Sequence, residues 1–109
     1  MIIWVYDLAA DGSAGNRREF VDYAPYDSAG GLAADINGNV YAAVRRADAP
    51  GIYVYNTEGK ELAAIPTGDV LPSNLAFGRG ANANLLYVTA GNGLYQIRVN
   101  RQGYHLPDR

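Results

Sequence analysis

The chain has 109 residues, of which 49% are hydrophobic, and its 9 basic side chains nearly balance its 11 acidic ones. This length allows one domain, and the apolar fraction is enough for a packed core. The low charge removes the attraction that nucleic acid or an anionic membrane surface requires, and no run of about 20 apolar residues could span a bilayer. We therefore expect neither nucleic acid nor a membrane as a partner.

The composition also restricts the chemistry. Cysteine is absent and His105 is the only histidine, so disulfides, thiolate metal sites and Ser/His/Asp triads are excluded or nearly so. We predict no catalytic residue in this chain. Residues 1–7 hold no basic group and reach an acid at Asp7, so we expect no signal peptide. Nothing in the sequence indicates the compartment.

In chain order, the sequence predicts short strands joined by tight turns. No helical i, i+3, i+4, i+7 pattern extends over three turns, so we predict no helix. The runs bounded by Gly, Asn, Asp and Pro predict nine strands. They cover residues 2–8, 18–23, 31–35, 39–44, 51–56, 60–65, 74–78, 85–90 and 93–99. Asn37-Gly38 and Glu58-Gly59 predict hairpin turns, since glycine accepts the positive φ of such turns.

Part of this pattern occurs twice. The matched pairs are Leu32/Leu75, Tyr41/Tyr87 and Tyr53/Tyr95, with offsets of 43, 46 and 42 residues. A strand repeat of this length is typical of a β-propeller blade. Residues 3–7 also match residues 52–56, which identifies the first predicted strand as an outer strand of a blade.

The repeat predicts an all-β propeller fragment of about two four-stranded blades. With strands named A to D from the centre outward, the order is C-D-A-B-C-D-A-B-C. Residues 1–28 then hold the outer strands of an incomplete blade. Residues 29–68 form a full blade, and residues 69–109 form a blade without its outermost strand, followed by a C-terminal tail.

A propeller ring needs about 4–8 blades, so this fragment requires completion. Open edges and unpartnered faces would otherwise leave backbone groups and apolar surface exposed. One route is self-association, in which three copies give a six-bladed ring with one redundant strand per copy. The other is the remainder of a longer parent propeller. Both alternatives stay open.

Several motifs in order resemble one known family. They read GLAADINGNVYAA at 31–43, PGIYVYNTEGKEL at 50–62, PSNLAFG at 72–78 and LYVTA at 86–90. They resemble the C-terminal part of the senescence-marker-protein, gluconolactonase and luciferin-regenerating family of six-bladed propellers. The resemblance extends from Trp4 to Pro107. It implies hydrolysis of a lactone, or sometimes of a phosphoester-like substrate, with one divalent metal, usually calcium, which polarises the carbonyl and activates water. The implied small-molecule partner is a lactone or a sugar acid.

The resemblance also implies where the metal ligands lie. Two of them, a Glu and an Asn, belong to blades outside this chain. The third is the Asp of a Pro-Asp-Gly triplet that begins an inner strand. The equivalent triplet here is Ala29-Gly30-Gly31, so Gly30 stands at the ligand position. Ser73 is its counterpart in the next blade, and a shifted Asp27 is the alternative ligand.

We therefore predict no metal ligand in this chain, and we expect Gly30, Ser73 and Asn74 to face the central tunnel. The other polar candidates have structural roles in this interpretation. Asp35 is expected to bind turn amides, and His105 to lie on the surface or dock the tail. The arginine pairs 17–18 and 45–46 are expected to be solvated or paired with Asp. The repeated tyrosines, namely Tyr53, Tyr55, Tyr87 and Tyr95, are expected to pack between blades.

Two functions remain. The chain is either a segment of a calcium-dependent lactonase that is not competent alone, or a non-catalytic propeller module. The module would have a structural or ligand-binding role and would assemble as a homo-oligomer, for example a trimer.

Overall fold

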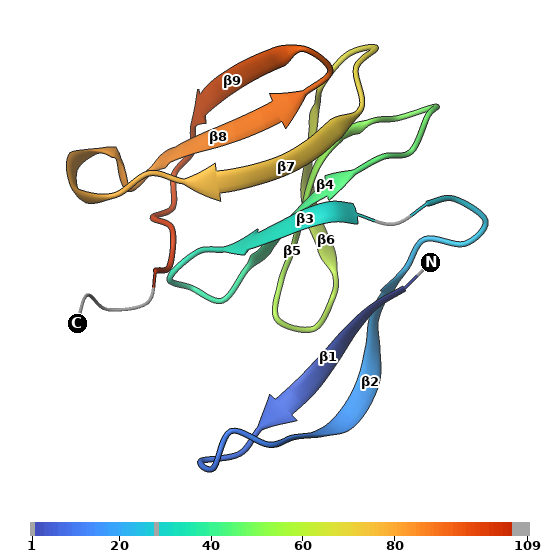
Figure 1. Ribbon diagram of the computed structural model, residues 1–109, viewed down its shortest axis with the longest axis vertical. Coiled ribbons are helices and arrows are strands. Elements are labelled where there is room, and N and C mark those ends of the chain that lie inside the picture. Colours follow the sequence, from blue (N-terminus) through green and yellow to red (C-terminus); the bar gives the residue numbers. More distant parts are fainter. Residues whose placement is uncertain (1, 28, 106–109) are drawn as a thin grey trace.

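The computed structural model describes residues 2–27 and 29–105, and it arranges them in three antiparallel sheets (Figure 1). The first sheet pairs β1 (Ile2–Leu8) with β2 (Ala14–Asp22). The second has the order β3 (Ala29–Ala34), β4 (Val40–Val44), β5 (Gly51–Tyr55) and β6 (Glu61–Pro66). The third has the order β7 (Pro72–Phe77), β8 (Leu85–Ala90) and β9 (Gly93–Arg98). A short 3₁₀ turn, η1 (Gly80–Asn82), precedes β8.

All nine predicted strands are present, and the all-β fold class is confirmed. Within the described residues there is no α-helix, and no helix long and apolar enough to cross a membrane. Three strands begin earlier than predicted, namely β2 at Ala14, β3 at Ala29 and β7 at Pro72. Residues 14–17 of β2 lack the apolar residues typical of a strand, but the pairing with β1 continues to Leu8 and Ala14. The assignment of the three sheets to blades of one ring stays a prediction.

Both predicted turns are confirmed. Gly38 and Gly59 have φ of 85° and 84°, which L side chains rarely adopt. The amide of Gly38 donates to the carbonyl of Asp35, and that of Gly59 donates to the carbonyl of Asn56. Each glycine therefore closes the turn between two strands of the second sheet.

The second sheet is covered on both faces. Alternate residues of β4 and β5 pack on β7 and β8 and form the larger core. Its buried members are Tyr41, Ala43, Ile52, Val54, Leu75, Phe77, Leu86 and Val88. The opposite face, with Ala42, Val44 and Tyr55, packs against Tyr23 and the first sheet. Burial on both faces explains why β4 is apolar throughout instead of alternating.

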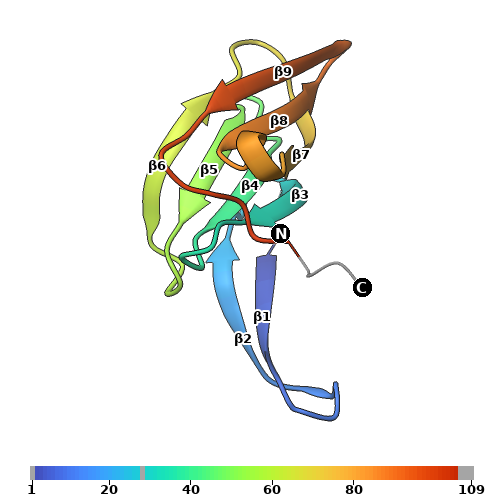
Figure 2. The same ribbon diagram turned by 90° about the vertical axis from the view of Figure 1, so that its left-hand side faces the viewer.

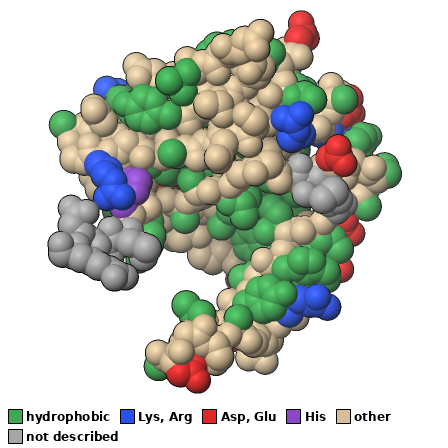
Figure 3. Space-filling view, in the orientation of Figure 1, with side chains coloured by type: hydrophobic (Ala, Val, Ile, Leu, Met, Phe, Trp, Pro, Cys, Tyr) green, Lys and Arg blue, Asp and Glu red, His purple; other side chains and the backbone are tan. Residues whose placement is uncertain are grey.

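The hairpin of β1 and β2 projects from the body formed by the other two sheets. Figure 2 shows the hairpin extending away from one end of the molecule, while β9 lies at the opposite end. Hydrophobic side chains are visible along this hairpin in Figure 3. The exposed large apolar side chains of β1 are Trp4, Tyr6 and Leu8, which are 40%, 49% and 76% exposed.

A buried carboxylate organises the turn between β3 and β4. Asp35 is 2% exposed and accepts hydrogen bonds from the amides of Asn37 and Asn39, at 2.9 and 3.0 Å. It also accepts from the side-chain amide of Asn39 and from the Tyr41 hydroxyl, at 2.9 and 3.1 Å. The predicted turn-binding role of Asp35 is thereby confirmed. Its bridge to Gly103 also joins the C-terminal segment to this turn.

Asp35→Ala should lower the free energy of unfolding by about 3 kcal/mol, because it leaves several donors at the turn without an acceptor. Urea denaturation followed by circular dichroism measures the change. The exposed turn residue Asp69 supplies the control, and Asp69→Ala should stay within about 0.5 kcal/mol of the unmodified chain. Equal effects of the two substitutions would contradict the role of Asp35.

The buried tyrosines predict a loss of stability at alkaline pH. Burial, together with the nearby Asp35 carboxylate, raises the pKa of Tyr41 to about 12, and burial also raises the pKa of Tyr23 and Tyr55. Below pH 10 these phenols are neutral in both states. Above pH 10 they ionise first in the unfolded chain, so stability should fall progressively towards pH 12. Urea denaturation between pH 8 and 12 tests this, and a flat profile would refute it.

Candidate functional site

The three residues predicted to face the tunnel lie together where β3 and β7 run side by side. Pairing of β3 with β4 is interrupted between Ala29 and Leu32, and pairing of β7 with β8 is interrupted between Pro72 and Asn74. The two inner strands therefore contain bulges at equivalent positions of the repeat. Bulges redirect side chains and recur beside binding sites. Whether this region lines a tunnel stays a prediction.

β3 and β7 approach each other closely at Gly30 and Gly31. A Cβ atom added at Gly30 would lie 2.7 Å from the carbonyl oxygen of Ser73 and 3.5 Å from Cδ of Arg45. A Cβ atom at Gly31 would overlap the side chain of Asn74. Both glycines thus permit an approach that any side chain would prevent. Position 30, where the resemblance implies a carboxylate, therefore has a glycine and no space for a larger side chain.

The oxygen atoms at this site are few and mostly occupied. The Ser73 hydroxyl lies 2.9 Å from the Thr89 hydroxyl and 3.2 Å from the Thr89 carbonyl oxygen. The side-chain oxygen of Asn74 accepts a hydrogen bond from the amide of Leu75 at 2.9 Å. Gly30, Ser73 and Asn74 are exposed, and none of them carries a charge. The site therefore offers polar contacts without a carboxylate.

These residues do not fit calcium. Calcium takes 6–8 oxygen ligands and usually includes carboxylates among them. Among the residues that the structure describes, no group of three His, Cys, Asp or Glu side chains could hold a metal ion. Asp27, the alternative ligand, is exposed in the segment before β3, and no described contact joins it to Gly30 or Ser73.

Arg45 is a site residue that sequence reasoning missed. Its Nη1 donates to the Pro72 carbonyl oxygen at 3.2 Å, and its side chain passes Gly30. Arg45 is exposed and places a positive charge beside the neutral candidates. Strand pairing could have located it, because the end of β4 lies opposite the beginning of β3, where Val44 pairs with Ala29.

Two of the other arginines in the predicted pairs, Arg46 and Arg18, have the expected Asp partner. Arg46 forms two hydrogen bonds with the Asp48 carboxylate, at 2.6 and 3.1 Å, and lies over the ring of Tyr26 at 4.0 Å. Arg18 pairs with Asp7 at 3.0 Å. The arginine that precedes it, Arg17, stacks instead on Trp4 at 4.3 Å. These groups are occupied in surface pairs, so we assign them no ligand.

His105 docks the tail as expected, with Nε2 3.0 Å from the Gly78 carbonyl oxygen. The expected packing of the repeated tyrosines holds best for Tyr55, whose ring is buried against Phe20 and Tyr23. It is wrong for Tyr95, which is 52% exposed. The physical reason is that the third sheet has only three strands, so no fourth strand covers this side chain.

The close approach at Gly30 gives a stability prediction with an internal control. Gly30→Ala should destabilise the fold by about 2 kcal/mol, because its methyl group would overlap the Ser73 carbonyl oxygen. Gly15 lies in β2 with no atom within 4 Å of an added Cβ, so Gly15→Ala should be neutral or slightly stabilising. Thermal and urea denaturation compare the two variants. A neutral Gly30→Ala would show that the two strands are not in close contact.

Comparisons with known proteins agree with this fold. Residues 1–92 match the family described as the SMP-30/gluconolactonase/LRE-like region. The chain is also similar to an X-ray structure of a protein provisionally identified as a gluconolactonase, with 27% identity and a TM-score of 0.79. This similarity covers 96% of the chain and 34% of that protein, so the chain spans about a third of its length. No curated protein matches the chain. The chain belongs to the SMP-30/gluconolactonase/LRE-like family.

Proposed function

We propose that this chain is a non-catalytic segment of a gluconolactonase-type propeller. In this proposal the chain forms part of the wall of a propeller ring and contributes polar side chains to its lining. It does not hold the metal centre. Lactone hydrolysis, the chemistry expected of the family, would then belong to a complete ring whose metal is bound by other blades. The chain needs additional blades, from other copies of itself or from the remainder of a longer protein.

The observation that carries this proposal is the geometry at Gly30. The family resemblance expects a carboxylate there, and the chain has a glycine. The backbone of β7 closes over the position, with the Ser73 oxygen 2.7 Å from where a Cβ would lie. Restoring a ligand would therefore require β7 to move away from β3, and this movement would disturb the packing of the second sheet on the third. A simple exchange of one side chain would not rebuild the metal site.

A second candidate function is the binding of a sugar acid, and Arg45 favours it. A guanidinium group is a good partner for a carboxylate, and hydroxyl groups such as those of Ser73 and Thr89 suit a polyol. Arg45, Ser73 and Thr89 all come from the bulged ends of the inner hairpins. In this function the segment would bind the product of a lactonase, a hydroxylated carboxylate, without hydrolysing anything.

The two functions can be separated with the purified chain. We expect no hydrolysis of δ-gluconolactone above the spontaneous rate, with or without calcium, and no heat of calcium binding in calorimetric titration. Gly30→Asp should gain neither property and should be less stable than the unmodified chain. Calcium-dependent turnover by the unmodified chain would refute the proposal. Binding of gluconate that is lost in Arg45→Gln would favour the sugar-acid function.

A further inference from the structure

The outer edges of the three sheets are protected unequally. Exposed strand edges pair with other chains unless charges or proline discourage it. β2 carries the charged run 17–19, and β6 has Glu61 at its beginning and Pro66 at its end. In contrast, β1 has no charged residue before Asp7, and β9 has none before Arg98. Two edges of the molecule are therefore open to pairing.

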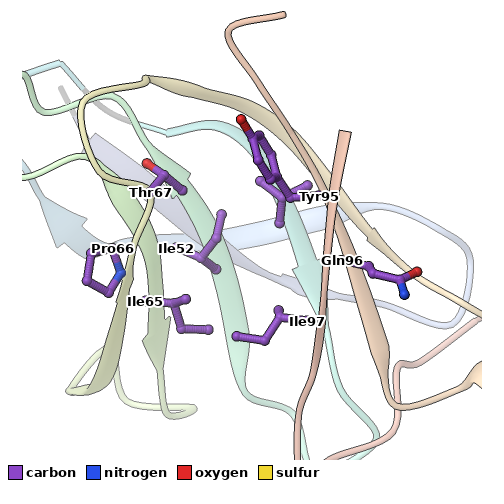
Figure 4. Close-up of a pocket in the computed structure, with 8 residues that line it drawn as sticks. Ile52, Ile65, Pro66, Thr67, Tyr95, Gln96 and Ile97 are labelled. Carbon is purple, nitrogen blue, oxygen red and sulfur yellow. The ribbon is translucent and has the colours of Figure 1, made fainter. Parts of the chain in front are cut away.

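An apolar crevice lies next to the open edge of β9. Its volume is about 320 Å³, and it lies between the outer strands of the second and third sheets. Figure 4 shows the side chains that line it from both sides. The lining residues are Ile52, Ile65, Pro66, Thr67, Val88, Tyr95, Gln96 and Ile97. Tyr95 and Ile97 are 52% and 38% exposed, although they line an apolar space.

The crevice exists because the two facing sheets differ by one strand. The second sheet has four strands and ends in β6, whereas the third has three and ends in β9. Ile65 of β6 therefore lines the crevice, and the third sheet has no fourth strand to cover it. A further strand beside β9 would cover Ile65 and continue the sheet, so the ligand that fits is an extended, apolar segment.

The backbone of β9 can accept such a strand. Gly91 and Asn92 form a two-residue turn, and Ala90 pairs with Gly93 across it. In a hairpin of this type the closing pair is hydrogen bonded, and successive residues then alternate between the partner strand and the open side. Leu94, Gln96 and Arg98 thus direct their amides and carbonyls to the open edge.

We propose that β9 and the adjacent crevice bind strand β1 of a second copy of this chain. β1 has seven residues and β9 six, so their lengths match. β1 exposes the apolar side chains of Trp4, Tyr6 and Leu8. It pairs only with β2, so its other edge is open. Within one chain the two strands lie at opposite ends of the molecule, so the pairing is between copies (Figures 1 and 2). The inference rests on the proposed need for further blades and names the surface that recruits them.

Such an interface joins different surfaces of the two copies. Head-to-tail contacts of this kind close into rings or continue as open chains, depending on the rotation between copies. Each copy then covers one crevice and loses one exposed β1. Because Trp4 is the only tryptophan and lies on β1, its fluorescence reports this burial.

The test uses variants that close one edge each. Gln96→Pro removes an amide that faces the open side of β9, and Tyr95→Lys is a second variant that places a charge at the crevice. The double variant Tyr6→Lys/Leu8→Lys places charges on exposed positions of β1. Leu62→Lys on β6 is the matched control, since Leu62 is 53% exposed on an edge that the proposal does not use. Circular dichroism establishes that each variant is folded.

Light scattering of the unmodified chain should give an average mass above the 11.7 kDa of the monomer, and this average should rise with concentration. The Leu62→Lys control should behave in the same way. In each β9 or β1 variant, association should be weakened at least about tenfold. Each variant should therefore be monomeric at concentrations where the unmodified chain associates. A 1:1 mixture of a β9 variant with the β1 variant should form a dimer, because each contributes one intact edge. The Trp4 emission should shift to shorter wavelength on mixing.

The outcomes separate this inference from the proposed function. Oligomers that persist in both the β1 and β9 variants would overturn the inference and leave the need for further blades intact. Dimers of the β1 variant alone would mean that β9 pairs with β9, and this result would also overturn it. A mixture that stays monomeric would do the same. An unmodified chain that is monomeric at all concentrations would overturn both the inference and assembly from identical copies.

Discussion

The close backbone approach of β3 and β7 is the contact on which the rest of the structure depends. It brings the bulged beginnings of the two inner strands within van der Waals distance and leaves no space for side chains at Gly30 and Gly31. The angle and spacing set there allow β4 and β5 to pack on β7 and β8 farther out. Tyr41 and Phe77 meet edge-to-face in this core, with ring centroids 5.0 Å apart. Both the packing of the sheets and the chemistry of the candidate site follow from this contact.

The same contact is compatible with the fold of the family but not with the metal ligand that the resemblance implies at Gly30. A metal centre at this position needs a carboxylate and room around it, and the inner strands here have neither. The remaining polar groups, with Arg45 beside them, are the basis of the proposed recognition of a hydroxylated anion. The chain thus has the fold of the gluconolactonase family, and the proposed structural or binding role rests on these residues of the inner strands.

The outer strands of the segment differ in how readily their edges can pair with another strand. Charges and proline cover the outer strands β2 and β6, so these edges disfavour pairing, whereas β1 and β9 are apolar and open. The second sheet is stabilised on both faces by its neighbours within the chain. The third sheet is stabilised on one side only, and the crevice beside β9 is the result. Among the described residues, the feature that most clearly lacks a partner is therefore the incompletely buried apolar surface beside β9, not a group that binds a specific ligand.

The sequence alone determined the nine strands, the glycine turns at 38 and 59, the role of Asp35 and the family, because these depend on local backbone preference and on a repeat that can be read in one dimension. It also predicted that Gly30 stands where the family resemblance implies a metal ligand, and this stays a prediction. It did not reveal Arg45 beside Gly30, the exposure of Tyr95 or the crevice beside β9. These features arise from pairing and packing between residues far apart in the chain. Side-chain environment in a sheet protein depends on which strand lies opposite, and only the tertiary structure decided this.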